Sequence, residues 1–279
     1  MLLKRSSLTR RWLIASSALA VVLGMAVPSA HASVLWRGDA ESGNLSQWSS
    51  IVYNCQVDGV RYTDAAHCSN RIRAVGSPTS GPHSRYAYRF ELQDGDVSSY
   101  GGERNELKQR NPDKLYPRGA ERFFGYSVRI GSDYPSDNQG VVNDWSALSE
   151  WKTVETHGSG PAAINMQTID NQITLKHAPK PWYFVWMSPL KRYEWNRFVV
   201  RVKFDPDPAV GFVEIWKNGQ LVKPRTYAST LEPMNGYVDP AYSKIGYYRN
   251  EAISGKGVVW IDDYKVGTSY EDVAPPPAP

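Results

Sequence analysis

The strongest restriction on the fold comes from short runs in which apolar and polar residues alternate. Successive side chains of a β-strand point to opposite faces, so such alternation predicts strands that bury one face. The clearest runs are residues 86–92, 124–130, 198–204 and 212–216. Asn218-Gly219 follows the last run and predicts a tight hairpin. Because no helical period persists, we expect an all-β sandwich or jelly roll.

The length and composition predict one folded domain. The chain has 279 residues, of which 41% are hydrophobic and 12% aromatic, which excludes a disordered or collagen-like chain and allows a sizeable core. We find no internal repeat or linker between residues 33 and 270 and assign this range to a single domain. Residues 271–279 end in Ala-Pro-Pro-Pro-Ala-Pro, which cannot pair in a sheet, so we interpret them as a C-terminal tail.

Residues 1–32 have the three parts of a secretory signal peptide. Basic residues come first, an apolar run covers 12–27, and residues 30–32 (Ala-His-Ala) form a small-x-small cleavage site. The apolar run is shorter than the ~20 residues of a membrane span, which makes an uncleaved anchor the weaker alternative. Residues 9–12 (Thr-Arg-Arg-Trp) loosely resemble a twin-arginine signal, so the export route stays open. We expect a secreted or periplasmic protein.

Cleavage after residue 32 removes the excess of positive charge. The full chain has 32 Lys and Arg and 28 Asp and Glu. The first 32 residues hold four of the basic residues (Lys4, Arg5, Arg10 and Arg11) and none of the acidic ones, so 28 of each remain. A neutral mature chain gives no reason to expect nucleic acid or an anionic membrane as a partner, and any polyanion must bind a local basic patch. We expect a monomer.

Cys55 and Cys68 are the only cysteines. An exported protein can keep a disulfide, so we expect one bridge that closes a surface loop, with two free thiols as the alternative. A bridge over so short a loop contributes about 3 kcal/mol at most, and its role is structural.

Three segments carry residues suited to chemistry. In residues 103–108 (Glu-Arg-Asn-Glu-Leu-Lys), a strand would place Arg104, Glu106 and Lys108 on one face. The alternative to a site is a solvated face with cross-strand ion pairs. In residues 155–157 (Glu-Thr-His), Glu155 and His157 would share a face if a strand continues from residue 151. Alternatively, this histidine is a hydrogen-bonded structural residue.

The third segment, residues 242–250 (Tyr-Ser-Lys-Ile-Gly-Tyr-Tyr-Arg-Asn), alternates in the same way. A strand would place Tyr242, Lys244, Tyr248 and Asn250 on one side, around the small Gly246. A lysine beside a tyrosine favours the phenolate and would lower the tyrosine pKa from about 10, which suits proton transfer. The alternative is an aromatic-rich strand with ordinary cross-strand packing.

Together the three segments resemble a known family. Residues 104–108 (Arg-Asn-Glu-Leu-Lys) are similar to the Arg-x-Glu-Leu-Arg block of the jelly-roll polysaccharide lyases. Glu-Thr-His lies where these lyases carry Gln-x-His, and residues 242–250 are similar to their Tyr-x-Lys-x-Gly-x-Tyr-x-Gln. The order also matches, and the surroundings most resemble the heparin lyase I and glucuronan lyase branch, which is related to alginate lyases. The resemblance covers nearly the whole mature chain and implies a concanavalin-like β-jelly roll of two antiparallel sheets.

The resemblance implies cleavage of a 4-linked uronate polysaccharide by β-elimination. Such a lyase removes the proton α to the uronate carboxylate and expels the glycosidic oxygen, which leaves an unsaturated uronate end. The carboxylate must be neutralised first, and a guanidinium can grip it, which suits Arg104. His157 would be the base and Tyr248 the acid, or Tyr248 would do both. Lys244 would tune Tyr248 and help to hold the substrate.

Other polar and aromatic residues would bind the acidic polymer. We expect these to be Glu106, Lys108, Glu155, Asn165, Gln167, Tyr242, Asn250 and Trp182. Trp182 would stack on a sugar ring, with core packing as the alternative. Glu155 departs from the family, which has an amide there. If ionised, it would repel the substrate unless it is paired with Arg104 or Lys108 or turned away. Asn165 and Gln167, alternating on the next expected strand, could supply the missing amide.

The chemistry requires no cofactor, but lyases of this branch often carry a structural calcium. If the first and last strands pair, Asp39, Glu41, Asp262 and Asp263 could bring carboxylate oxygens together. Solvated acidic turns are the alternative, since the chain has no contiguous calcium-binding loop.

Two other classes of function remain open. A non-catalytic carbohydrate-binding jelly roll would use aromatic platforms without needing both His157 and Tyr248. A concanavalin-like glycoside hydrolase would need two carboxylates flanking the bond, and its Glu-x-Asp-x-Glu type of strand is absent. Glucuronan, heparin-type chains and alginate all offer the same acidic proton. Our expectation is glucuronan or a related glucuronate polymer.

Overall fold

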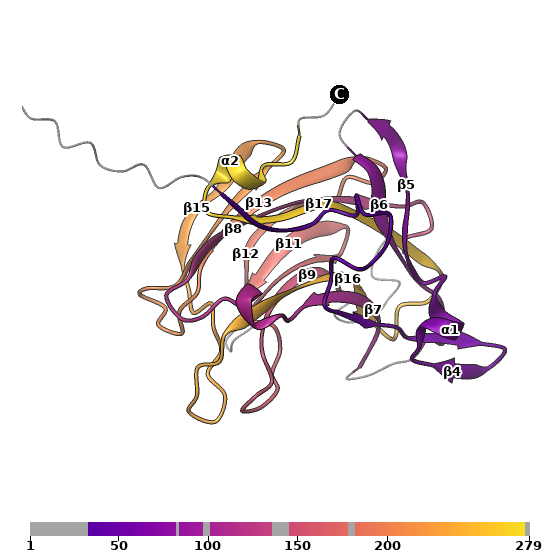
Figure 1. The fold of residues 1–279 in the computed structure, drawn as a ribbon, viewed down its shortest axis with the longest axis horizontal. Coiled ribbons are helices and arrows are strands. Elements are labelled where there is room, and N and C mark those ends of the chain that lie inside the picture. The colour runs from indigo at the N-terminus through magenta and orange to yellow at the C-terminus, as the bar shows by residue number, and fades with distance from the viewer. Residues whose placement is uncertain (1–32, 82–83, 97–100, 136–144, 178–181, 277–279) are drawn as a thin grey trace, which may run out of the picture. The chain divides into compact units, whose positions relative to one another are not determined.

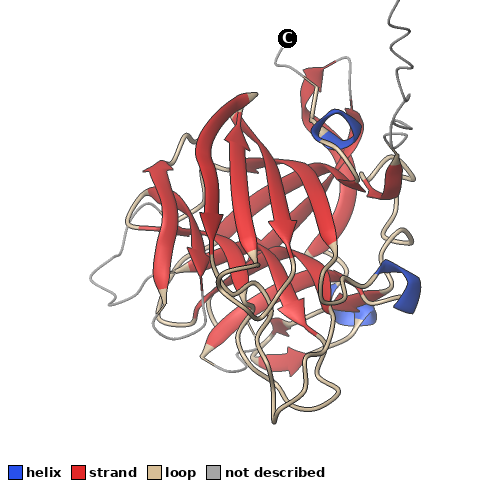
Figure 2. Cartoon of the chain, turned by 90° about the vertical axis from the view of Figure 1, so that its left-hand side faces the viewer, coloured by secondary structure: helices blue, strands red, loops and turns tan. Residues whose placement is uncertain are grey.

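Antiparallel strands stacked in two layers make up nearly all of the structure (Figures 1 and 2). The computed structural model describes residues 33–81, 84–96, 101–135, 145–177 and 182–276. The expected all-β sandwich of two sheets in one domain is confirmed. The expected signal peptide lies outside the described residues. In the described ranges, no helix has the length and apolar character needed to cross a bilayer.

The first sheet has eight strands in the order β15-β14-β13-β8-β17-β6-β5, with β1 also paired to β17. The strands are β1 Val34–Gly38, β5 Ile72–Gly81, β6 Ser84–Leu92, β8 Glu121–Ile130, β13 Trp195–Lys203, β14 Phe212–Lys217, β15 Gln220–Tyr227 and β17 Gly257–Gly267. The four predicted runs lie in β6, β8, β13 and β14, except that Phe204 follows the end of β13. Asn218 and Gly219, with φ of +52° and +82°, form the expected turn between β14 and β15.

The second sheet has seven strands in the order β12-β11-β10-β9-β16-β7-β2. They are β2 Ser50–Val52, β7 Gly102–Gln109, β9 Ser146–Thr153, β10 Ile164–Ile169, β11 Gln172–His177, β12 Tyr183–Pro189 and β16 Ala241–Asn250. The remaining elements are the β3 Cys55–Val57 and β4 Val60–Tyr62 hairpin, the helices α1 Ala65–Cys68 and α2 Tyr270–Val273, and a 3₁₀ turn, Pro112–Lys114.

An aromatic core between the sheets determines which way β16 faces. The hydroxyls of Tyr116, before β8, and Tyr264, in β17, lie 2.8 and 2.9 Å from Ser243 Oγ of β16. Ile245 and Tyr247 are buried in the same core. Because side chains alternate along a strand, the even-numbered residues of β16 point away from the core.

Two local features hold short elements at the periphery of the domain. Cys55 and Cys68 form the expected disulfide, which links β3 to α1. At the other end, α2 lies on the outer side of the first sheet, where Val273 is completely buried. A Cβ at Gly125 in β8 would overlap the carbonyl oxygen of Val273, so the two elements are in direct contact. The chain therefore stays packed to Val273, beyond the point at which we placed the start of the tail.

The edge strands of the two sheets either contain a proline or are short. The long edge strands β5, β12 and β15 contain Pro78, Pro189 and Pro224 respectively, and the other strands with a single neighbour, β1 and β2, have only five and three residues. Proline has no backbone N–H and cannot donate to a neighbouring strand.

Candidate active site

Strands β7 and β16 lie side by side in the second sheet and present their even-numbered residues on its outer face. Arg104 is opposite Tyr248, Glu106 is opposite Gly246, and Lys108 is opposite Lys244. A Cβ at Gly246 would overlap the carbonyl oxygen of Asn105, so only glycine allows this close approach. We call this surface the polar face. Its members are Arg104, Glu106, Lys108, Glu150, Lys152, Asn165, Gln167, Tyr242, Lys244 and Tyr248.

Lys244 lies at the centre of the polar face, between two carboxylates. Its Nζ is 2.7 Å from Glu106 Oε1 and also binds Glu150 Oε2. At most 9% of any of the three side chains is exposed. Burial opposes ionisation of the ammonium, but the two carboxylates raise the pKa of Lys244. Lys244 is therefore an ionised, fully engaged partner and not a free cation.

The two carboxylates that share Lys244 differ from each other. Burial and the repulsion of Glu106 raise the pKa of Glu150 against the pull of the ammonium. Burial acts in the same direction on Glu106, but Lys244 and Arg104 outweigh it and lower the pKa of Glu106. Glu106 is therefore the ionised partner, and Glu150 is the carboxyl that takes up a proton more readily.

Tyr248 lies between a cation and an aromatic ring. The guanidinium carbon of Arg104 is 3.8 Å from the centre of the Tyr248 ring, and the ring of Trp145 approaches edge-on at 4.7 Å. We expected a lowered pKa, but the pKa of Tyr248 is raised. Burial is the largest cause, and Glu150 and Glu106 add to it. Lys244, 5.8 Å from the ring centre, cannot compensate because its charge is balanced by these carboxylates.

His157 lies far from Tyr248. Glu155 and His157 would share a face if a strand continued from residue 151, but β9 ends at Thr153. The imidazole Nδ1 lies 2.9 Å from Asp239 Oδ1, and the ring stacks on Tyr237 at 3.9 Å. Asp239 lies two residues before the start of β16, whereas Tyr248 is near its end, and the strand from Ala241 to Tyr248 spans about 24 Å at ~3.4 Å per residue. The structure does not bring His157 and Tyr248 together.

Glu155 is paired, but not with the residues that we considered. Arg110 Nη2 is 2.7 Å from Glu155 Oε2, and Lys152 Nζ is 3.2 Å from Oε1. The Tyr242 hydroxyl donates to the same Oε1 at 3.2 Å. Burial opposes ionisation, but Lys152 and Arg110 lower the pKa of Glu155. Its charge is thus outnumbered by two cations at this end of the polar face.

The polar face continues onto β10 and β11, as the expected position of Asn165 and Gln167 implied. Asn165 is opposite Lys176, and Gln167 is opposite Thr174. Among the described residues, Asn165 Oδ1 is buried without a hydrogen-bond partner. Trp182 is half exposed just before β12, with Lys176 Nζ 4.6 Å from its ring.

Asn250 lies at the last position of β16, opposite Gly102 of β7. Its Oδ1 accepts the Ala252 backbone N–H at 3.0 Å. This hydrogen bond holds the turn that follows the strand.

The polysaccharide lyase family model matches residues 40–265. The chain belongs to this family. No curated protein matches the sequence. Among solved structures, an endo-β-1,4-glucuronan lyase from the fungus Trichoderma reesei has 19% identity and a TM-score of 0.59, over 83% of this chain and 100% of that one.

Two further solved structures resemble this chain. A GH131 β-glucanase catalytic domain from Podospora anserina has 10% identity and a TM-score of 0.58, over 87% and 98% of the chains. The family 7 alginate lyase A1-II′ has 12% identity and a TM-score of 0.53, over 77% and 92%. At such identities these likenesses show the fold alone, which a hydrolase shares.

Two residues of the polar face in this lyase escaped prediction from the sequence. Glu150 is opposite Lys244 and Asn165, and Lys152 is opposite Tyr242. The sequence signal was the alternation in Glu150-Trp151-Lys152, where two charged residues flank a tryptophan that is completely buried. This triplet, and not Glu-Thr-His, occupies the strand beside β16.

The expected calcium ligands of the lyase are engaged in other contacts. The first and last strands pair, with Gly38 opposite Tyr264. However, Asp39 Oδ1 accepts from Gln47 Nε2 at 2.9 Å, and Glu41 Oε1 accepts two backbone N–H groups at 2.8 and 2.9 Å. Burial and then Asp39 raise the pKa of Asp263 against the pull of Lys265. Across the described ranges, no group of three or more His, Cys, Asp or Glu side chains is placed to hold a metal. Glu41 also raises the pKa of Asp263, so the carboxylates of Asp39, Glu41 and Asp263 lie near one another.

Proposed function

We propose that this lyase cleaves a 4-linked glucuronate polymer by β-elimination at Tyr248. The observation that carries the proposal is the stacking of the Arg104 guanidinium on the Tyr248 ring, on an outer sheet face rich in cations. Membership of the polysaccharide lyase family and the likeness to a glucuronan lyase support it.

Arg104 and Lys108 are the cations that would neutralise the uronate carboxylate. Both project from β7 on the polar face, on either side of Glu106. Burial lowers the pKa of Lys108, and the nearby Lys244 and Arg104 contribute to this shift against Glu106. A bound carboxylate would reverse part of that effect, because an opposite charge favours the ammonium. The neutralised carboxylate then makes the α proton acidic enough to remove.

Tyr248 would serve as both base and acid. Its phenolate takes the proton from the carbon α to the carboxylate, and a carbon–carbon double bond forms as the glycosidic C–O bond breaks. The phenol then returns the proton to the departing oxygen. The separation of His157 from Tyr248 supports this single-residue route over a histidine base.

One specific observation favours a lyase over a glycoside hydrolase. A hydrolase needs two carboxyl groups on opposite sides of the bond that it cuts. The polar face does carry Glu106 and Glu150, but both bind Lys244 and are nearly inaccessible. Neither is free to flank a sugar bond.

We also propose that residues 1–32 direct export and that the mature protein is a secreted or periplasmic monomer. The Cys55–Cys68 disulfide supports export, because such bonds persist in oxidising compartments. A structural calcium at Asp39, Glu41 and Asp263 stays a prediction.

The test is incubation of the purified mature protein with glucuronan, heparin, heparan sulfate, alginate and hyaluronan while the ultraviolet absorbance of unsaturated uronate is recorded. We expect absorbance to rise on glucuronan, to disappear in Tyr248→Phe, and to persist within tenfold in His157→Ala. New reducing ends without absorbance would instead indicate a hydrolase. Binding without either signal would indicate a carbohydrate-binding module.

A further inference from the structure

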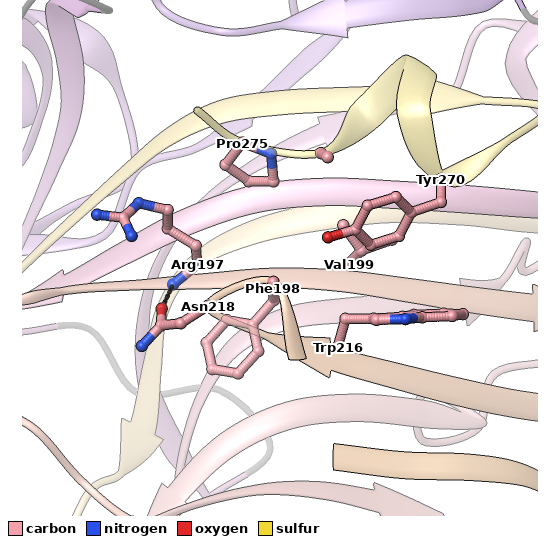
Figure 3. A pocket seen from close by; sticks show the side chains of 9 residues that line it. Arg197, Phe198, Val199, Trp216, Asn218, Tyr270 and Pro275 are labelled. Carbon is pink, nitrogen blue, oxygen red and sulfur yellow. Dashed lines mark hydrogen bonds between the residues drawn. The ribbon is translucent and has the colours of Figure 1, made fainter. Parts of the chain in front are cut away.

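A cavity of about 480 Å³ lies on the outer side of the first sheet, the layer that does not carry the polar face (Figure 3). Its floor is formed by Val199 of β13 and Trp216 of β14, which are opposite each other in the sheet. The neighbouring residues Phe198 and Ile215 point into the core, so the floor faces outward. We call this cavity the back pocket.

The walls of the back pocket are fixed by hydrogen bonds and close packing. On one side, the Arg197 backbone N–H donates to Asn218 Oδ1 at 3.0 Å, and the Asn218 N–H donates to the Arg197 carbonyl at 2.8 Å. On the other side, a capping box begins α2: the Asp272 N–H donates to the Ser269 hydroxyl, and the Ser269 N–H donates to the Asp272 carboxylate. The pocket is thus bounded by a tight hairpin and a helix that packs on β8.

The side chains around the back pocket suit an acidic sugar. The rings of Trp216 and Tyr270 lie 5.3 Å apart at 55° to each other, so they are in contact and line the pocket together. Arg197 also lines the pocket, and Figure 3 shows it on the side away from Trp216 and Tyr270, with its guanidinium extending outward. Arg197 forms no ion pair within the described ranges, and no acidic residue lines the pocket. Aromatic faces pack on sugar rings, and a guanidinium binds a carboxylate.

We propose that the back pocket is a second, non-catalytic binding site for the acidic polysaccharide. The ligand class rests on the proposed function, whereas the site itself rests on the cavity and its lining. Because the two sites lie on opposite faces of the sandwich, a long chain bound at the back would raise the concentration of sugar near the polar face.

The test counts binding sites by calorimetry. A glucuronan tetrasaccharide is titrated into the Tyr248→Phe protein, and we expect two sites. Arg197→Gln in this background should leave one site, and so should Trp216→Ala as a second variant. Arg104→Gln should leave the other one. Tyr227→Ala is the matched control, since Tyr227 is an exposed ring on the neighbouring β15. It should keep both sites.

Cellotetraose tests the role of the carboxylate, because it has the same β-1,4 backbone without the acid groups. We expect it to bind the back pocket at least tenfold more weakly. A single site that Arg104→Gln removes and Arg197→Gln spares would overturn the back pocket alone. A single site with the reverse behaviour would overturn the polar face as the substrate site, and no binding by any variant would overturn both proposals.

Discussion

At the scale of single residues, Lys244 is the cation on which the polar face depends. Removing it would leave Glu106 and Glu150 buried beside each other without a counter-charge. We expect Lys244→Met to lower the free energy of unfolding by about 3–5 kcal/mol. Urea denaturation of the variant measures this loss, with Lys108→Met as the control that should lose about 1 kcal/mol or less. Adding Glu150→Gln to Lys244→Met should restore part of the stability, and strict additivity would contradict the coupling.

Glu150 is the second residue with a specific prediction. Its carboxylate opposes the Tyr248 phenolate and would repel the acidic polymer that we propose as the substrate. We therefore expect Glu150→Gln to lower KM for the acidic polymer several-fold. If Tyr248 reacts as a phenolate, kcat/KM should rise with pH up to the raised pKa of Tyr248. Because the variant removes a charge that raises this pKa, the rising limb should move to lower pH. An unchanged pH profile would show that Glu150 does not act on Tyr248.

The positions of site residues could be predicted from the sequence only where alternating residues indicated a strand. The alternation of Arg104, Glu106 and Lys108, and of Tyr242, Lys244 and Tyr248, predicted the correct faces because a strand has a fixed period of two. The binding of Lys244 to two carboxylates could not be predicted, because one of them, Glu150, lies on β9. Which distant strands pair with each other is not encoded in the local sequence. Whether a strand continues from residue 151 to His157 stayed open in the sequence, because no turn signal marks the end of β9 before Glu155.

At the scale of elements, the contact between β7 and β16 depends on Gly246. A methyl group there would push β16 away from the Asn105 carbonyl and the Glu106 backbone. We expect Gly246→Ala to reduce kcat at least tenfold and to lower the melting temperature, because Arg104 and Tyr248 are held together by this pairing. Gly76→Ala in β5 is the matched control, since nothing lies within 4 Å of an added Cβ there. Equal effects of the two substitutions would contradict the proposed role of the close approach.

The elements themselves were largely predictable. Residues 86–92, 124–130 and 212–216 all lie in strands with the expected alternation, and Asn218-Gly219 makes the expected turn. The helical turn α2 was not predicted, because its signal is a capping box over only four residues beside a proline-rich tail. Its position depends on contacts with β8 and not on helix propensity.

At the scale of the whole molecule, attraction for an acidic polymer must be local. The mature chain predicted from the sequence carries 28 basic and 28 acidic residues, so no net field draws the substrate. The cations of the polar face act over roughly 10 Å at 0.1 M salt. We expect KM to rise several-fold when NaCl is increased from about 0.05 M to 0.5 M, with kcat little changed. Initial rates over this range measure the effect, and a KM independent of salt would contradict binding through these cations.

The prolines of the long edge strands affect how this molecule behaves among its own copies. A free sheet edge is a template on which another chain can add a strand, and such growth leads to aggregates. Pro78, Pro189 and Pro224 each leave an edge strand with one backbone donor fewer, and β1 and β2 are short. These features disfavour the addition of strands from other copies at the sheet edges, even when the protein is concentrated. Many copies of the enzyme can then gather on one polymer chain, which offers many bonds to cleave.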